Sequence, residues 1–158
     1  MRSPARLVSV VLDETTLAEP HPLIAEERAA AIRDLAAGDG LFRPAGHERG
    51  AFRLKLSIVD GRLAFDITDR FDAPVARHLL SLTPLSRLIK DYFLICESYR
   101  AAIPVAPASR IEALDMGRRG LHDEAAEVLR QRLAGKIDMD LETARRLFTL
   151  VCALRWKG

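Results

Sequence analysis

The sequence predicts an α+β fold: a small antiparallel β-sheet of three or four strands, packed against a long central helix at 84–103 and a C-terminal helical layer. Two observations predict it. Alternating apolar and polar residues, interrupted by turn signals, fill 51–82, whereas apolar residues at helical spacing fill most of 83–158. Strands early in a chain and helices late are typical of α+β proteins. The length of 158 residues predicts a single domain spanning 1–158.

The first fifty residues predict a strand, a helix and two polar connectors. Residues 6–12 form a short β-branched run with apolar side chains on both faces, which suits a strand covered on both sides. A polar connector with two prolines follows at 13–22. Residues 23–37 are rich in Ala, Glu and Arg, which favour helix. Three glycines and a proline at 39–50 predict a surface loop.

A β-hairpin at 52–67 is the sharpest local prediction. Apolar and polar residues alternate on both sides of an Asp-Gly pair at 60–61, the preferred dipeptide of a type I′ turn. A two-residue loop there pairs Leu56 with Phe65 and collects the apolar side chains on one face. A slip of one residue would move them to the other face, so the sequence specifies the register.

The third strand of the sheet is predicted at 75–82, and the strand at 6–12 is expected to join it. The central helix follows directly. Thr83 is a suitable N-cap, and Pro84 suits the first helical position because its missing N–H needs no partner there. Apolar residues cover most of the circumference of this helix. A helix of that kind is expected to be buried on several sides, with the rest of the chain packed around it.

Three shorter helices are expected to close over the central helix. The glycines of Gly117–Gly120 predict a break between a short helix at 107–116 and an amphipathic helix at 121–134. Asp138 or Asp140 is expected to begin a final helix, because either side chain can cap its first turn.

Composition limits the class of protein. The apolar fraction of 49% excludes general disorder, and the net charge of +2 is too small to indicate nucleic acid by itself. No secretory signal opens the chain and no apolar run is long enough to span a bilayer, so we expect a soluble cytoplasmic protein without membrane contact. Cys96 and Cys152 fall on apolar helix positions and are expected to be buried free thiols.

The Gly-Arg-Arg-Gly stretch and the histidine that follows it form the most suggestive candidate site. Arg118, Arg119 and His122 would stand at the N-terminus of the helix at 121–134, where free backbone amides favour an anion. The pattern therefore predicts a phosphate or carboxylate site. An ordinary glycine-broken turn with solvated arginines explains the same residues.

A polar strip on the central helix is the second candidate. It consists of Arg87, Lys90 and Asp91. The strip could form one wall of a cleft, or a solvated edge in which Arg87 pairs with Asp91 four residues later. If it faced the loop at 117–122, strip and loop would form one ligand- or anion-binding site.

Other chemistries find little support in the sequence. No second His or Cys lies at ligand spacing from His122, so no metal site is predicted, and no cofactor motif is present. No nucleophile elbow occurs, and Cys96 lies among apolar neighbours that favour core packing over reactivity. Arg53, Lys55 and Arg62 lie on the polar face of the sheet without the aromatic residues that stack bases in sheet-type RNA binders. Residues 110–132 could resemble a helix-turn-helix, but the turn is basic and the second helix is rich in acidic residues, so DNA binding is not expected. RNA stays an open alternative.

Five stretches of the chain match a known family. LSIVDGRLAFD, LSLTP, KDYFLICESY, EALDMGRRGLHDE and ARRLFTLVCALRWKG resemble uncharacterised protein family 0262, a bacterial family of chains of about this length. The resemblance covers essentially the whole chain. It implies a soluble bacterial cytoplasmic protein with no established activity, and it transfers no catalytic residue.

Two functional hypotheses remain from the sequence. The first is a non-enzymatic binding or adaptor protein that meets an acidic partner protein or a small anion through Arg118, Arg119 and His122. The second is an enzyme acting on a phosphorylated or carboxylated metabolite, with the same loop holding the anion and Asp91 or His122 as acid/base. The enzyme requires a concave pocket that joins the loop to a titratable side chain. The partner's identity and the oligomeric state do not follow from the sequence.

Overall fold

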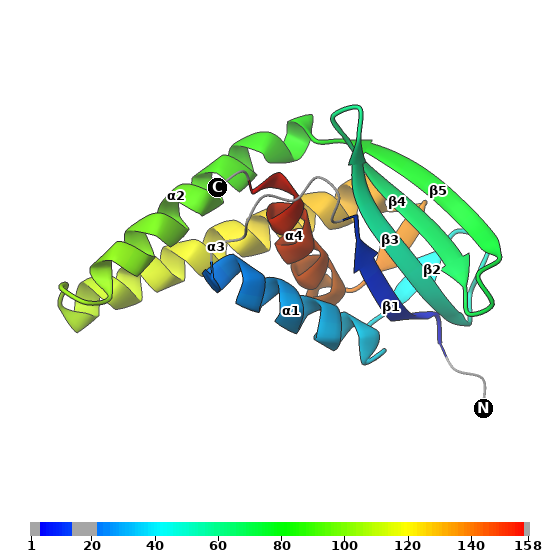
Figure 1. Cartoon of the computed structure of the whole chain (residues 1–158), viewed down its shortest axis with the longest axis horizontal. Coiled ribbons are helices and arrows are strands. Elements are labelled where there is room, and N and C mark those ends of the chain that lie inside the picture. The colour runs from blue at the N-terminus through cyan, green and yellow to red at the C-terminus, as the bar shows by residue number, and fades with distance from the viewer. Residues whose placement is uncertain (1–3, 14–21, 157–158) are drawn as a thin grey trace.

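The structure is a computed structural model that describes residues 4–13 and 22–156, so most of the predicted connector at 13–22 lies outside the described residues. It is an α+β fold with a mixed four-stranded sheet, a two-stranded sheet and a group of packed helices (Figure 1). One hydrophobic cluster runs through both parts, from Ala5 on the sheet side to Leu154 on the helical side.

The main sheet has the strand order β1-β3-β4-β5. Its strands are β1 (Arg6–Leu12), β3 (Ala51–Val59), β4 (Arg62–Asp69) and β5 (Pro74–Ser81). The last three form the predicted antiparallel meander, and β1 joins its edge, as expected, but parallel to β3. The parallel pairing is possible because α1 supplies the crossover between β1 and the meander.

The hairpin register is confirmed. Leu56 pairs with Phe65, and both side chains are fully buried. Asp60 and Gly61 both have positive φ, 52° and 73°, as a type I′ turn requires. The alternation of the two strands was therefore sufficient to specify the pairing.

A second, two-stranded sheet was not predicted. It pairs β2 (Phe42–Pro44) with β6 (Ile137–Met139), and β2 lies within the predicted loop at 39–50. Strands of three residues are too short for an alternation pattern to be recognised, so only the folded chain shows that these two segments meet.

The four described helices are α1 (Pro22–Ala36), α2 (Thr83–Ala102), α3 (Ala108–Leu133) and α4 (Leu141–Arg155). The predicted break at 117–120 is wrong, because α3 continues through both glycines for 26 residues. A Cβ added to Gly117 would lie 2.7 Å from Cδ1 of Ile95 on α2. Gly117 therefore lets two helices approach closely and does not end one. Each interior glycine costs a helix only about 1 kcal/mol, which the packing of a long helix can offset.

The most buried helix is α4, and the expectation that the chain packs around the helix at 83–103 is corrected. Nine residues of α4 are buried, against four of α2. α4 packs against both α1 and α3, whereas α2 packs along α3, and these two long helices extend together away from the sheet (Figure 1). The broad apolar arc of α2 therefore leaves Leu94 59% exposed.

The two predicted helix starts have different outcomes. α4 begins as predicted, because the Asp140 carboxylate accepts a hydrogen bond from the backbone N–H of Thr143 at 3.0 Å. Thr83 is not an N-cap. It is the first residue of α2, and the cap position is occupied by Leu82 without a side-chain hydrogen bond. Pro84 therefore falls one position later than predicted. Within the described residues, no helix is both long and apolar enough to cross a membrane.

Candidate functional site

Charged side chains gather in an open groove between α1, α3 and α4. Its volume is about 540 Å³, which is within the range of small-molecule sites. We call it the arginine groove, because four arginines line it. Its lining residues are Glu27, Ala30, Ala31, Asp34, Tyr92, Arg118, Arg119, His122, Asp123, Arg145, Arg146 and Thr149.

Three of the six predicted site residues line the arginine groove. Arg118 and His122 are four residues apart on α3, and Arg119 is three residues before His122. A continuous helix therefore presents all three toward one side. The reason given for an anion site there is nevertheless wrong. These residues lie in the interior of α3, where the backbone amides are used by the helix, so no helix N-terminus is available to an anion.

The polar strip of α2 does not line the arginine groove. Arg87 is 92% exposed and lies 3.8 Å from the Asp91 carboxylate, so the two form the ordinary surface ion pair. Lys90 lines a different surface hollow, together with Phe93 and Trp156. None of the three residues of the strip lines the groove, so the strip on α2 and the predicted site residues on α3 do not form one pocket.

Arg118 is the most constrained charge in the groove. Its guanidinium donates to Asp115 at 2.7 Å, reaches Glu27 of α1 at 3.5 Å, and stacks over the Tyr99 ring with 5.0 Å to the centroid. Its Nε is buried and has no hydrogen-bond partner among the described residues. Arg118 therefore ties α1 to the α2–α3 pair while one of its donors remains unused.

Burial and the charge of Arg118 shift the pKa values of the groups around it. Burial alone would lower the pKa of Arg118, but the hydrogen bond to Asp115 and the nearby Tyr92 raise it, so the guanidinium stays charged. Burial raises the pKa of Glu27, and the positive charge of Arg118 only partly opposes that effect. Burial also raises the pKa of Tyr92 strongly, helped by the negative charge of Glu27.

The other three arginines of the groove are also paired with carboxylates. Arg119 lies 3.1 Å from Asp115, which it shares with Arg118. Arg145 donates to Asp123 at 2.7 Å and also contacts Glu142. Arg146 lies 4.0 Å from Asp34, at the limit of an ion pair. The groove is thus rich in arginine, but its positive charge is largely neutralised by the protein itself.

His122 is half-buried beside α4. Its Nε2 lies 2.9 Å from Oγ1 of Thr149, a hydrogen bond in which either group can be the donor. The same hydroxyl lies 3.2 Å from the backbone carbonyl of Arg145. Burial lowers the pKa of His122 to about 4. Its ring packs edge-on against Tyr92 and Phe148, with centroids 5.3 and 5.1 Å away.

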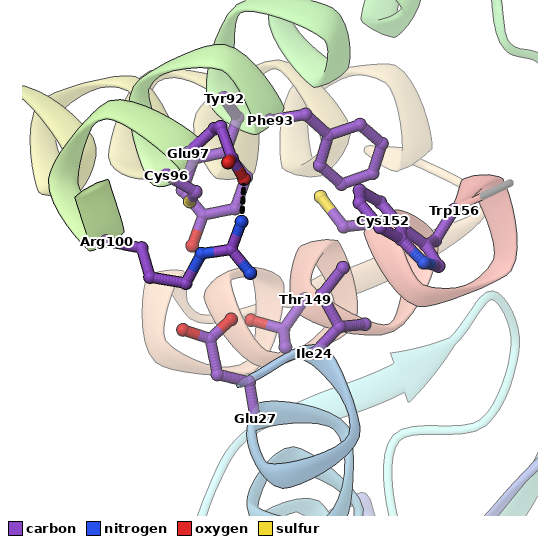
Figure 2. Close-up of a pocket in the computed structure, with 10 residues that line it drawn as sticks. All are labelled: Ile24, Glu27, Tyr92, Phe93, Cys96, Glu97, Arg100, Thr149, Cys152 and Trp156. Atoms are coloured by element: carbon purple, nitrogen blue, oxygen red, sulfur yellow. Dashed lines mark hydrogen bonds and ion pairs between the residues drawn. The ribbon is translucent and has the colours of Figure 1, made fainter. Parts of the chain in front are cut away.

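A small pocket adjoins the groove and shares Glu27, Tyr92 and Thr149 with it (Figure 2). Its volume is about 40 Å³, little more than the share of one water molecule in the liquid. Figure 2 shows the Arg100 side chain extending across this pocket between Glu97 and Glu27. A pocket of this size holds water or a very small group.

Both cysteines line the small pocket as free thiols. Cys152 is buried, as predicted, whereas Cys96 is half-buried. Burial raises the pKa of both thiols. A raised pKa keeps a thiol protonated and unreactive, so neither side chain is suited to nucleophilic chemistry. Among the described residues, no cluster of three or more His, Cys, Asp or Glu side chains could hold a metal ion.

Sequence reasoning missed the residues that other helices bring to the groove. Glu27 lies 91 positions from Arg118 in the chain, and Thr149 lies 27 positions from His122. Both contacts depend on how α1 and α4 pack beside α3, which no local spacing encodes. One signal was available in the sequence: Glu27 is a charged residue on a helix whose apolar residues predicted that one face is buried.

Fold and site define an α+β protein with a ligand-sized groove and no recognisable catalytic centre among the described residues. The chain belongs to the uncharacterised protein family UPF0262, whose sequence profile matches residues 4–157. A UPF0262 protein of Rhizobium meliloti is 55% identical over 153 residues, which cover 97% of this chain and 96% of the relative. A UPF0262 protein of Nitrobacter hamburgensis is 54% identical over 153 residues, covering 97% and 93%. No solved structure matches the chain.

Proposed function

We propose that this cytoplasmic protein is a non-enzymatic binding protein whose arginine groove holds a small molecule bearing a carboxylate or phosphate group. One observation carries the proposal: four arginines from two helices line a single groove of about 540 Å³. Arginine is suited to carboxylates and phosphates because its planar donors bind two oxygens at once.

The intramolecular carboxylates do not prevent binding. Arg119 has a side chain that is 73% exposed, and the pair of Arg146 with Asp34 spans 4.0 Å. The Asp115 and Arg146 side chains are only 22% and 31% exposed, but the groove is open, and ion pairs in contact with solvent contribute about 0–1 kcal/mol, so a ligand oxygen can replace the protein carboxylate. Arg118 is held by Asp115 and Glu27, so its role would be to keep α1 and α3 together. Arg119 and Arg146 would bind the anion.

A pair of matched variants tests the proposal. The purified protein is titrated calorimetrically with a panel of carboxylated and phosphorylated metabolites, and with any small molecule that co-purifies from the native host. Arg119→Ala combined with Arg146→Ala should weaken binding of the anion at least tenfold, because two charge-assisted contacts are lost. Arg87→Ala is the control, since it removes an exposed arginine from outside the groove. Equal affinity of both variants for every anion that binds would refute the proposal.

An enzyme is the second candidate, and the state of His122 is the observation that favours it. The low pKa of His122 keeps its imidazole neutral near pH 7, and the ring lines the same groove as the arginines. The enzyme hypothesis predicts turnover of the bound anion that His122→Gln abolishes while the affinity for the anion is kept. If the ligand is recovered unchanged after prolonged incubation with the native protein, binding without catalysis is the function.

A further inference from the structure

A second charged surface lies at the end of the main sheet, away from the arginine groove. It is an open hollow of about 520 Å³, which we call the sheet-end hollow. It is lined by Arg6, His47, Arg49, Gly50, Ala51, Phe52, Asp69, Arg70, Phe71 and Val75. These residues come from β1, from the start of β3 and the segment before it, and from the end of β4, the turn after it and the start of β5.

The arginines of the sheet-end hollow keep their charge available. Among the described residues, Arg6, Arg49 and Arg70 form no ion pair. The one carboxylate that lines the hollow belongs to Asp69, and its Oδ1 accepts the backbone N–H groups of Phe71 at 2.8 Å and of Ala73 at 3.0 Å. That carboxylate holds the turn and leaves the hollow with an excess of positive charge.

The same turn presents an aromatic ring to solvent. The Phe71 side chain is 76% exposed, and the Arg70 guanidinium lies 4.8 Å from its centroid. Exposure of this extent is unusual for phenylalanine, which is most often buried. A second ring, His47, lines the hollow and packs edge-on against Phe52 with centroids 5.8 Å apart. Exposed rings beside arginines that have no carboxylate partner are the combination that stacks unpaired bases while cations hold the phosphates.

A further open hollow of about 1010 Å³ adjoins the first and shares His47 and Arg49 with it. Its own charges are balanced, because Arg43 is paired with Asp138 at 3.3 Å and Glu48 adds a second carboxylate. The excess of positive charge therefore belongs to the sheet-end hollow.

We propose that the sheet-end hollow binds single-stranded nucleic acid. Arg6, Arg49 and Arg70 contact its phosphates, and one base stacks on Phe71. A single strand fits better than a duplex, because only an unpaired base can leave its own stack to lie on the ring. The polar face of the sheet, where aromatic residues are missing, is not part of this surface. The aromatic ring comes from the turn beyond the strands.

The test uses the full chain and fluorescently labelled twelve-nucleotide RNA and DNA strands of the same mixed sequence. Fluorescence anisotropy should show binding that weakens as salt rises from about 50 to about 200 mM. Phe71→Ala should weaken binding roughly tenfold, since one stacked base is lost. Arg49→Ala with Arg70→Ala should reduce the slope of log affinity against log salt by about 1.4, the effect of two phosphate contacts on a single strand. A preference for the RNA or the DNA strand identifies the natural source.

Three controls keep the result specific. Val105→Ala removes an apolar side chain that is 84% exposed at the far end of the α2–α3 pair, and it should leave the affinity unchanged. Arg119→Ala with Arg146→Ala should also leave it unchanged, which separates this surface from the arginine groove. Circular dichroism verifies that each variant is folded. The proposal is overturned if neither strand binds at low salt, if the matching duplex binds more tightly, or if Phe71→Ala binds like the native chain.

Discussion

The arginine groove and the sheet-end hollow both collect arginines, but the two sets are in different electrostatic states. All four arginines of the groove lie within 4.0 Å of a carboxylate of the protein. The three arginines of the hollow have no such partner among the described residues. Arginine content alone therefore does not identify an anion-binding surface. What matters is whether the fold has already supplied the counter-charge.

The difference implies separate roles for the two regions. Charges of the groove connect α1, α3 and α4, so they contribute to stability and must exchange partners when a ligand binds. Charges of the hollow form no ion pair among the described residues and remain available to a partner. Four substitutions or conditions test this comparison, from the largest expected effect to the smallest.

Replacing Arg118 should cause the largest loss of stability. Arg118→Met keeps most of the apolar stem but leaves Glu27 without its cation and Asp115 with Arg119 alone. Breaking such a half-buried network should lower the free energy of unfolding by about 3 kcal/mol. Urea denaturation followed by circular dichroism measures it. Adding Glu27→Gln to Arg118→Met should recover part of the loss. If Arg70→Met in the hollow is as damaging, the contrast between the two regions is wrong.

The pH dependence of stability should depend on His122. Its pKa is about 4 in the folded state, whereas an unfolded histidine titrates near 6.5. The unfolded chain therefore binds a proton that the folded chain resists, and the free energy of unfolding should decrease by about 2.5 kcal/mol as the pH falls from about 6.5 to about 4.

The His122→Gln variant isolates this contribution in parallel urea titrations. The raised pKa of Glu27 acts in the opposite direction, because the folded chain then keeps a proton that the unfolded chain has released. Since Glu27 is present in both proteins, the difference between their pH profiles reports His122. Identical profiles would show that the imidazole is not buried as described.

The two glycines of α3 test whether the groove wall is one helix. Gly120→Ala should stabilise the protein by about 1 kcal/mol, because nothing lies within 4 Å of the added Cβ and alanine favours helix. Gly117→Ala should gain less, because its Cβ would meet Cδ1 of Ile95 at 2.7 Å and displace it. Shortening that side chain with Ile95→Val should restore the difference. Destabilisation by Gly120→Ala in thermal unfolding would instead indicate a turn at this position.

The smallest effects are expected from arginines without structural contacts. Arg87→Ala removes a pair that spans 3.8 Å on a side chain 92% exposed, and Arg49→Ala removes no ion pair among the described residues. Each should change the free energy of unfolding by less than about 0.5 kcal/mol. Urea titration under the conditions used for Arg118→Met gives the comparison. A loss near 2 kcal/mol at Arg49 would mean that the hollow has a structural role as well.

Local chemistry made parts of the fold predictable. The alternation around Asp60-Gly61 specified the pairing of Leu56 with Phe65, because only one register puts the apolar side chains on a common face. The cap at Asp140 was among the two starts predicted for α4, because a carboxylate before an apolar helical run can accept an amide of the first turn. Both features depend on residues close together in the chain.

Local chemistry misled where two elements pack together. Gly117 and Gly120 predicted a helix break, since glycine is costly inside a helix. In the structure Gly117 leaves room for the side chain of Ile95 on α2, which a Cβ at this position would meet. The apolar arc of α2 suggested the centre of the protein, although Leu94 on that arc is 59% exposed. A sequence pattern shows which side chains avoid water, and it does not show whether another element covers them.

The sequence by itself determined the α+β class, the register of the meander and the presence of Arg118, Arg119 and His122 along one stretch. Only the tertiary structure decided what those residues meet. Packing of α1 beside α3 brings Glu27 to Arg118, and packing of α4 brings Thr149 to His122. The available charge lies elsewhere, at the end of the sheet. The physical reason is that hydrogen bonds along a strand or helix follow local spacing, whereas counter-charges come from segments that only folding brings together.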